Sequence, residues 1–351
     1  MEPRPATRPA LGLRLRSLWT RIIDGPSKPL RKDIRQLQRQ VERMQQVLDE
    51  TAVRAARGDQ IASQLRHIAL LDSQQRGRLA EALALLDQTR VGAHIRAVVD
   101  RATLVHEPFE HLVLDPVLPP PVYDLLIEAL PPLPFFGERD PVKQDLPLPL
   151  TLAPALSTHV WNFVHEVVAV QLLRPALLAK FREPLERHYD LVFGPGTREQ
   201  AESLPGGTSG GRLMLRRPGY HLDPHRDPKR SLLTCLLYLA RPGDDERYGT
   251  QIFRVEGDAE AGYKQTYYPE QEGHRCELAG VVPFRANTML VFLNSKGAHG
   301  ADIPHDAPAD LERYTYQFYV TPRADALSAL VKSLPKDRRA QWRNKGQVRG
   351  A

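Results

Sequence analysis

Two His-x-Asp triplets stand close together in the middle of the chain, His221/Asp223 and His225/Asp227. In a β-strand, residues two apart point to the same face, so either triplet can direct an imidazole and a carboxylate at one point. A third ligand from another strand would complete a set of two imidazoles and one carboxylate. Such a set binds non-heme iron and leaves half of an octahedron open for a cosubstrate and oxygen.

The residues that follow predict strands able to supply the rest of such a site. Apolar runs at 232–239 and 288–293 read as buried strands, and the second leads into His299. We favour His299 as the distal ligand over His274 and His305 because it follows a predicted rigid strand most closely. Arg313 opens the last predicted strand, and its guanidinium can hold a carboxylate through two parallel hydrogen bonds. These are the parts that a 2-oxoglutarate site requires.

Several motifs in order carry a resemblance to a known family. Residues 104–322 resemble the iron(II)/2-oxoglutarate-dependent dioxygenases of the prolyl-hydroxylase-like type, and 108–115 resembles the lead-in strand of bacterial members. The motifs are Pro218-Gly219-x-x-Leu222-x-Pro224-His225-x-Asp227, the strand Thr234–Leu239, Phe292-x-Asn294, Ala298-His299-Gly300 and Arg313-Tyr314. The fold that this resemblance implies is a double-stranded β-helix, or jelly roll, with flanking helices.

The resemblance also implies roles for individual residues. His225, Asp227 and His299 would bind Fe(II), and Arg313, assisted by Tyr238, would bind 2-oxoglutarate. O2 would be the oxidant, with ascorbate as an auxiliary reductant. The implied reaction is hydroxylation of an unidentified small molecule or side chain, with release of succinate and CO2. The motif selects His225/Asp227 over the competing triplet, whose own role stays open.

Two other interpretations remain beside the hydroxylase. The barrel could be a non-catalytic scaffold that assembles through the N-terminal region, or a cupin-like enzyme without a cosubstrate. The basic run Arg226, Lys229 and Arg230 could meet an anionic substrate, although a charge run beside a turn is more often solvated.

Two features argue against a nucleic-acid substrate. Related nucleic-acid demethylases carry a second arginine six residues after the first, where this chain has Tyr319. Residues 104–322 also carry more acidic than basic side chains, whereas a nucleic-acid groove is usually positive.

The region before the predicted barrel reads as helical. Apolar residues alternate at spacings of four and three over 30–48, the pattern of a coiled coil: Leu30, Ile34, Leu37, Val41, Met44 and Leu48. This seam predicts a homo-oligomer; the alternative is a helical hairpin with a second stretch that contains Leu79, Leu83 and Leu86. The chain therefore divides into a basic amphipathic segment (1–28), a helical and coiled-coil region (29–103), the dioxygenase domain (104–322) and a basic, solvated C-terminal tail (323–351).

Composition bounds the remaining possibilities. The chain has 351 residues, a net charge of +6 and two cysteines. Two cysteines can form at most one disulfide within the chain, which is too few to stabilise a fold of this size. We therefore expect a reducing compartment and a cytoplasmic protein. The positive charge lies in the two ends of the chain. Because a short basic amphipathic helix can lie on an anionic membrane, 1–28 predicts a peripheral contact with such a surface.

Overall fold

A computed structural model describes residues 28–137, 140–195, 206–258 and 265–340 together with Glu199 and Trp342. The predicted amphipathic segment lies outside these residues except for Lys28. The chain divides into two compact units, one ending at Ser63 and one beginning at Gln64. Among the described helices, none combines the length and the apolar character needed to cross a membrane.

The first unit contains most of a single long helix, α2 (Lys28–Leu85). Four residues of the predicted seam are exposed on it: Leu37 at 54%, Val41 at 63%, Met44 at 66% and Leu48 at 61%. The stretch with Leu79 and Leu83 is the end of the same helix, so these two segments do not form a hairpin with each other. The coiled coil remains a prediction.

The second unit begins with the end of α2 and continues in α3 (Gln88–Arg101). The Asp87 carboxylate caps α3 by accepting hydrogen bonds from the amides of Thr89 and Arg90, at 2.8 and 3.1 Å. The further helices are α4 (Pro120–Glu128), α5 (Ala155–Asn162), the π-helical η2 (Phe163–Leu173), α6 (Arg174–Lys180) and α7 (Arg182–Phe193). Short 3-10 turns are η1 (Leu133–Phe135) and η3 (Pro269–Glu272).

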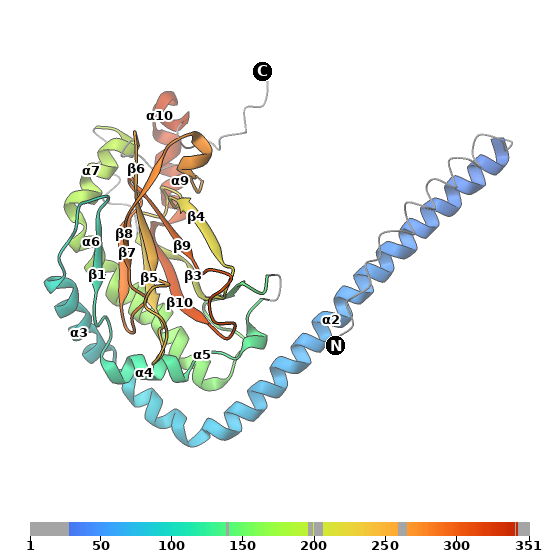
Figure 1. Ribbon diagram of the computed structural model, residues 1–351, viewed down its shortest axis with the longest axis horizontal. Coiled ribbons are helices and arrows are strands. Elements are labelled where there is room, and N and C mark those ends of the chain that lie inside the picture. The colour runs from blue at the N-terminus through green and yellow to red at the C-terminus, as the bar shows by residue number, and fades with distance from the viewer. Residues whose placement is uncertain are drawn as a thin grey trace. The chain divides into compact units, whose positions relative to one another are not determined.

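Two antiparallel sheets form the centre of this unit (Figure 1). The six-stranded sheet has the order β1 (His111–Leu114), β8 (Met289–Leu293), β5 (Leu233–Tyr238), β10 (Arg313–Pro322), β3 (Gly206–Arg216), β2 (Lys143–Pro147). The four-stranded sheet has the order β4 (His221–His225), β9 (Ala298–Asp302), β6 (Thr250–Val255), β7 (Cys276–Val282). This arrangement agrees with the predicted β core and flanking helices.

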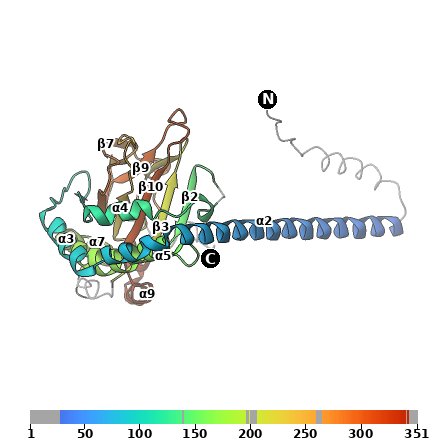
Figure 2. The same cartoon turned by 90° about the horizontal axis from the view of Figure 1, so that it is seen from below.

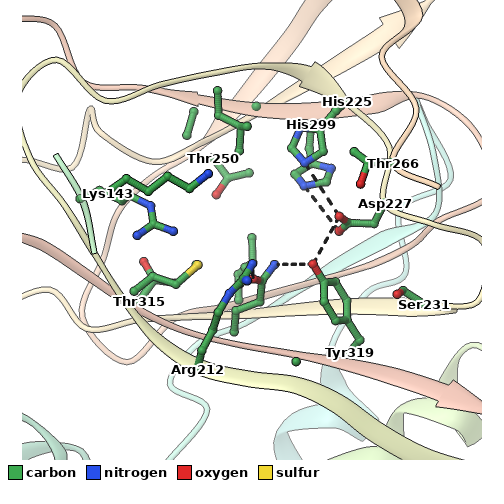
Figure 3. A pocket seen from close by; sticks show the side chains of 18 of the residues that line it. Lys143, Arg212, His225, Asp227, Ser231, Thr250, Thr266, His299, Thr315 and Tyr319 are labelled. Atoms are coloured by element: carbon green, nitrogen blue, oxygen red, sulfur yellow. Dashed lines mark hydrogen bonds and ion pairs between the residues drawn. The ribbon is translucent and has the colours of Figure 1, made fainter. Parts of the chain in front are cut away.

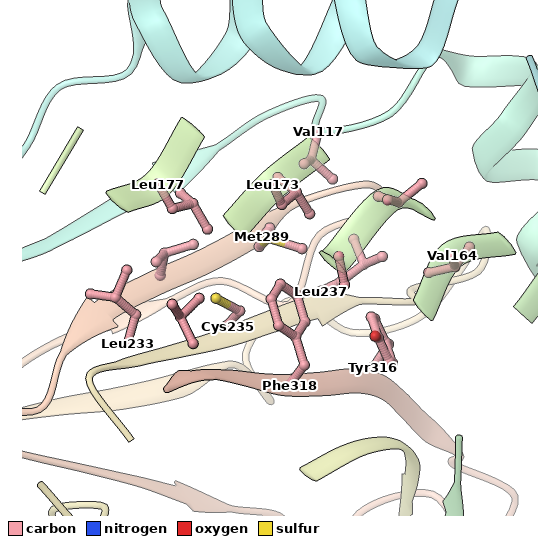
Figure 4. Close-up of a cluster of buried hydrophobic side chains, with 14 of the residues drawn as sticks. Val117, Val164, Leu173, Leu177, Leu233, Cys235, Leu237, Met289, Tyr316 and Phe318 are labelled. Carbon is pink, nitrogen blue, oxygen red and sulfur yellow. The ribbon is translucent and has the colours of Figure 1, made fainter. Parts of the chain in front are cut away.

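Helices cover one face of the six-stranded sheet. Figure 2 shows α3, α5 and α7 on one side of the strands and β7 on the other. Alternate residues of β5, Leu233, Cys235 and Leu237, point toward Leu173 and Leu177 of the helical layer (Figure 4). Since neighbours in a strand point to opposite faces, the remaining β5 side chains point into the space between the sheets. Burial on both faces explains why this strand is mostly apolar, with Thr234 as an exception.

The first part of the predicted C-terminal tail is folded, so a free tail is wrong for these residues, although the basic side chains of Lys336 and Arg339 are exposed as expected. It forms α9 (Ala324–Ser333) and α10 (Lys336–Ala340). Leu330, Leu334 and Trp342 join the main hydrophobic core. The Trp342 ring stacks on Phe193 with centroids 5.3 Å apart. Apolar burial thus outweighs the basic composition that suggested a free tail.

Candidate metal centre and anion pocket

A cavity of about 490 Å³ lies where the inner faces of the sheets meet. Side chains of β3, β4, β9 and β10 line it, together with the loops that follow β4 and precede η3 (Figure 3). Its volume falls in the range of pockets for small ligands. The four residues that motif order predicts for iron and the cosubstrate carboxylate, His225, Asp227, His299 and Arg313, all line this one cavity.

The pairing of β4 with β9 brings the two histidines together. His225 stands directly opposite His299 in the antiparallel register, and the two ring centroids are 4.1 Å apart. Asp227 follows β4, with its carboxylate oxygens 3.9 Å from His225 Nε2 and 3.8 Å from His299 Nε2. One ligand atom from each residue lies within 4.8 Å of the others. The sequence-distant groups therefore converge on one point.

Neighbouring groups fix the orientation of the histidines. His225 Nδ1 lies 3.0 Å from the Asp223 carbonyl oxygen, a contact that assigns the proton to Nδ1 and leaves the Nε2 lone pair free. The ring of Tyr268 stacks on His225, and Phe292 packs on His299. Burial lowers the pKa of His299 well below its ordinary value, with the charge of His225 acting in the same direction. A neutral imidazole is the form that binds a metal.

The Asp227 carboxylate is held from two sides. Thr234 Oγ1 donates to Oδ2 at 2.8 Å, and the Tyr319 hydroxyl donates to Oδ1 at 3.3 Å. Burial raises the pKa of Tyr319, which keeps its phenolic proton available for this bond. Asn294 Nδ2 in turn donates to Thr234 Oγ1 at 2.8 Å. Neither side chain was predicted to take part in the site: Thr234 stands only in a motif strand, and Tyr319 only where related demethylases carry a second arginine.

The competing triplet lies apart from this cluster. The exposed His221 ring sits between two carboxylates, with Nδ1 2.8 Å from Asp302 Oδ1 and Nε2 3.0 Å from Asp223 Oδ1. These hydrogen bonds raise the pKa of His221. Among the described residues that line the cavity, none belongs to this group of three. His274 and His305, which compete with His299 for the distal position, do not belong to that lining either.

The backbone conformation before β4 explains why the motif has a glycine at position 219. Gly219 precedes β4 with φ of 88°, in the left-handed region that favours glycine, and a Cβ there would come within 2.6 Å of the His305 ring. The turn at Pro218-Gly219 therefore directs the chain into the strand that carries His225.

Arg313 is a buried cation that lines the cavity, 5% exposed. Its Nε donates to the Tyr248 carbonyl, and its Nη1 donates to Thr315 Oγ1 at 3.3 Å. The rings of Phe284 and Tyr238 lie 5.0 and 5.6 Å from the guanidinium carbon. Burial lowers the pKa of Arg313 from its ordinary value. Within the described residues no carboxylate forms an ion pair with it, so an anionic ligand would satisfy it.

Tyr238 is not one of the described residues that line the cavity. Its hydroxyl donates to Thr250 Oγ1 at 2.8 Å, and Thr250 itself lines the cavity. Of the two hydroxyls, that of Thr250 is therefore the one that lines the cavity, while the Tyr238 ring packs against the Arg313 guanidinium.

The basic run around the triplet is not solvated as a whole. Arg226 is 1% exposed and forms an ion pair with Asp258, and Lys229 is 3% exposed. Burial lowers the pKa of Lys229 to about 8, and its ammonium lies 4.4 Å from the Trp342 ring centroid. Arg230 is exposed and lines the cavity. Only Arg230 of the three can meet a ligand in this pocket.

Comparison with known proteins gives structural likenesses only. No family model matches the sequence, and no curated protein matches it. A prolyl-4-hydroxylase from Pseudomonas putida is 17% identical, over 65% of this chain and 99% of that chain, with a TM-score of 0.35. HygX from Streptomyces hygroscopicus, solved with nickel and 2-oxoglutarate bound, is 14% identical over 61% of this chain and 83% of its own, with a TM-score of 0.35.

A third solved structure is the non-heme alpha-ketoglutarate-dependent carbocyclase SnoK from nogalamycin biosynthesis. It is 11% identical over 66% of this chain and 86% of its own, with a TM-score of 0.33. At these values the likenesses carry no weight for function, which depends on the geometry of the cavity.

Proposed function

We propose that this chain is an Fe(II)- and 2-oxoglutarate-dependent dioxygenase that hydroxylates a small molecule or a side chain and releases succinate and CO2. One observation carries the proposal: His225, Asp227 and His299 converge in the cavity that also contains the buried Arg313. A metal-binding set and a cation without a carboxylate partner among the described residues meet two different needs of this chemistry. Their presence in one pocket supports both ligands together.

The donor set fits ferrous iron. Two imidazole nitrogens and one carboxylate oxygen are the ligands of the non-heme iron oxygenases, and softer thiolate ligands are not among the three. The iron and 2-oxoglutarate, when bound, supply the oxidation itself, with O2 as oxidant. The task of the protein is therefore to bind, orient and shield.

The metal-binding set, Arg313 and their neighbours each have a part in that task. His225, Asp227 and His299 would hold the metal, and Thr234 would keep the Asp227 carboxylate turned toward it. Arg313 and Thr250 would bind the carboxylate of 2-oxoglutarate that lies away from the metal. The rings of Tyr238 and Phe284 exclude water around the Arg313 guanidinium, which strengthens its hold on an anion.

A non-catalytic scaffold would give no reason for these contacts. The triad and Arg313 are polar groups buried at 5–6% exposure, and such groups are costly unless a ligand or partner satisfies them. The exposed seam on α2 is compatible with assembly in either case.

Binding of 2-oxoglutarate tests the proposal directly. Anaerobic calorimetry on protein loaded with Mn(II), a redox-silent stand-in for iron, should show metal-dependent binding. The Arg313→Met variant should weaken this binding by roughly tenfold or more, because it removes a charge-assisted fork, and should retain Mn(II). Arg247→Met, at an exposed arginine outside the cavity, is the matched control. Unchanged affinity in Arg313→Met would show that Arg313 does not bind 2-oxoglutarate. Absence of binding in the unchanged protein would leave a metal enzyme without this cosubstrate.

A further inference from the structure

The cavity holds more positive charge than iron and 2-oxoglutarate would use. Besides Arg313, four basic side chains line it: Lys143, Arg212, Arg216 and Arg230. Asp227 is the one acidic side chain among the described lining residues. This contrasts with the acidic composition of residues 104–322 as a whole. The pocket lining is therefore basic although the domain as a whole is not.

The edge of the six-stranded sheet places three of these groups. Arg212 and Arg216 are four residues apart on β3 and so share a strand face. Lys143 on β2 stands opposite Arg216 in the antiparallel register. In Figure 3 the Lys143 side chain extends into the pocket from the side opposite His225, His299 and Asp227. Lys143, Arg212 and Arg216 thus form a basic wall of the cavity, and Lys143 lies across it from the metal ligands.

Protein carboxylates neutralise only part of this wall. Asp145 lies 2.8 Å from Arg216 Nη2 and 3.9 Å from Arg212 Nη1. Arg212 also donates from Nε to Gln317 Oε1 at 2.9 Å, which fixes its guanidinium in place. No ion pair to Lys143 or Arg230 is formed within the part of the chain that the structure describes. Their charges remain available to a ligand.

With a metal and 2-oxoglutarate bound, the pocket would contain more positive than negative charges. A divalent metal with the Asp227 carboxylate and the two carboxylates of 2-oxoglutarate carries one net negative charge, which Arg313 balances. Asp145 offsets one further cation of the wall. Lys143, Arg212 and Arg230 then face the remaining space without a counter-charge. Like charges that converge on one cavity repel one another and attract anions.

We propose that the substrate is a small anionic molecule whose carboxylate or phosphate group binds between Lys143 and Arg212. This rests on the proposed function, since it assigns 2-oxoglutarate to Arg313 and leaves the wall to the substrate. The cavity volume of about 490 Å³ suits a small molecule beside the cosubstrate. The anionic group would anchor the substrate across the cavity from the metal ligands.

The test compares matched probes on full-length protein loaded with Mn(II) and 2-oxoglutarate under anaerobic conditions. Calorimetry with glycerol 3-phosphate, glycerate and uncharged glycerol separates the effect of an anionic group from that of the carbon frame. We expect both anions to bind at concentrations up to about 10 mM and glycerol not to bind. Phosphate-bearing and carboxylate-bearing substrates are distinguished by which anion binds more tightly.

Two variants locate the binding site. Lys143→Met should weaken binding of the anionic probes by about tenfold compared with the unchanged protein. Its affinity for 2-oxoglutarate should change much less. Lys332→Met, at an exposed lysine of α9 outside the cavity, should bind them as the unchanged protein does. Circular dichroism confirms that both variants are folded.

The possible failures are distinguishable. Absence of metal-dependent 2-oxoglutarate binding would overturn the proposed function itself. Normal 2-oxoglutarate binding, with no preference for the anions over glycerol, would overturn the anionic substrate alone. Anion binding that is equal in Lys143→Met and the unchanged protein would also overturn it, because the anions would then lie elsewhere.

Discussion

The Thr234 hydroxyl orients the carboxylate of Asp227, one of the three proposed metal ligands. It donates to Asp227 Oδ2 at 2.8 Å and accepts a hydrogen bond from Asn294 Nδ2 at the same distance. A carboxylate with fixed oxygens presents the remaining lone pairs to the metal without losing rotational freedom on binding.

Replacing Thr234 with valine should therefore weaken metal binding while preserving the shape of the side chain. We expect the Mn(II) affinity to fall by about tenfold to a hundredfold. Thr234→Ser, which keeps the hydroxyl, should restore most of it. Calorimetric titration with Mn(II) measures both. Equal affinities for the valine and serine variants would show that the hydroxyl does not position Asp227.

His221 offers a titration that is independent of the metal centre. Its hydrogen bonds to Asp302 and Asp223 favour the protonated ring and raise its pKa above the ordinary value. The contribution of these two hydrogen bonds to the free energy of unfolding is fully present below the ordinary pKa of histidine. It is lost as the pH rises through the raised pKa of His221.

NMR titration of the His221 ring should show this raised pKa in the folded protein. In Asp302→Asn the pKa should move down toward the ordinary value because the largest cause of the shift is removed. Addition of Mn(II) or Zn(II) should not displace the His221 proton before His225 and His299 are occupied. A normal His221 pKa in the unchanged protein would contradict the hydrogen bonds to the two carboxylates.

For individual residues, the sequence predicts the site positions that lie close together along the chain or within a family motif. His225, Asp227, His299 and Arg313 line one cavity as expected from strand alternation and motif order. Thr234, Tyr319 and Lys143 could not be placed in this way. Their positions depend on the pairing of β5 with β10, of β10 with β3 and of β3 with β2, and no local pattern fixes these registers.

Among the elements, the loop after β4 is held by one buried arginine. Arg226 donates from Nη1 to the Ser295 carbonyl at 3.0 Å and from Nε to the Gly297 carbonyl at 3.2 Å, and it forms an ion pair with Asp258. Residues 295–297 form the turn between β8 and β9, which leads to His299. Arg226 therefore ties together the two segments that carry the proposed metal ligands.

Removing this arginine should destabilise the whole barrel. In Arg226→Met the Asp258 carboxylate would stay buried without its cation, a change that costs about 3–5 kcal/mol of unfolding free energy. Urea unfolding monitored by tryptophan fluorescence measures the loss. Arg247→Met, in an exposed pair with Asp245, should leave the unfolding midpoint nearly unchanged. Similar midpoints for both variants would show that Arg226 is not a structural tie.

The same element shows where sequence patterns mislead. Arg226, Lys229 and Arg230 form one charge run, and composition alone favours solvent exposure for all three. Two of them are buried, because carbonyl groups and a carboxylate surround Arg226 and the Trp342 ring covers Lys229. Those partners lie far away in the sequence. The long α2, in contrast, was predictable as a helix from its periodicity, although its continuity to Leu85 was not.

At the scale of the whole molecule, the seam on α2 remains without a described partner in its own unit. Leu37, Val41, Met44 and Leu48 follow the coiled-coil spacing and are more than half exposed. A second copy of the helix would bury them, as in other coiled coils.

We therefore predict that the full chain self-associates through residues 30–48. Light scattering coupled to gel filtration should give the mass of a dimer or trimer. The double variant Val41→Glu/Met44→Glu should be a monomer, since it places charges in the seam, whereas Gln46→Glu, off the seam, should keep the oligomer. A monomeric unchanged protein at micromolar concentration would contradict this prediction.

The central claim is that two histidines and one aspartate, brought together by the pairing of β4 with β9, form a metal centre. Its most direct measurement is metal content after anaerobic loading with Fe(II) and removal of free metal, read by elemental analysis. We predict about one iron per chain for the unchanged protein and for His221→Ala, and little or none for Asp227→Ala and His299→Ala. Folded protein that retains no iron, or a His299→Ala variant that retains as much as the unchanged protein, would contradict the account.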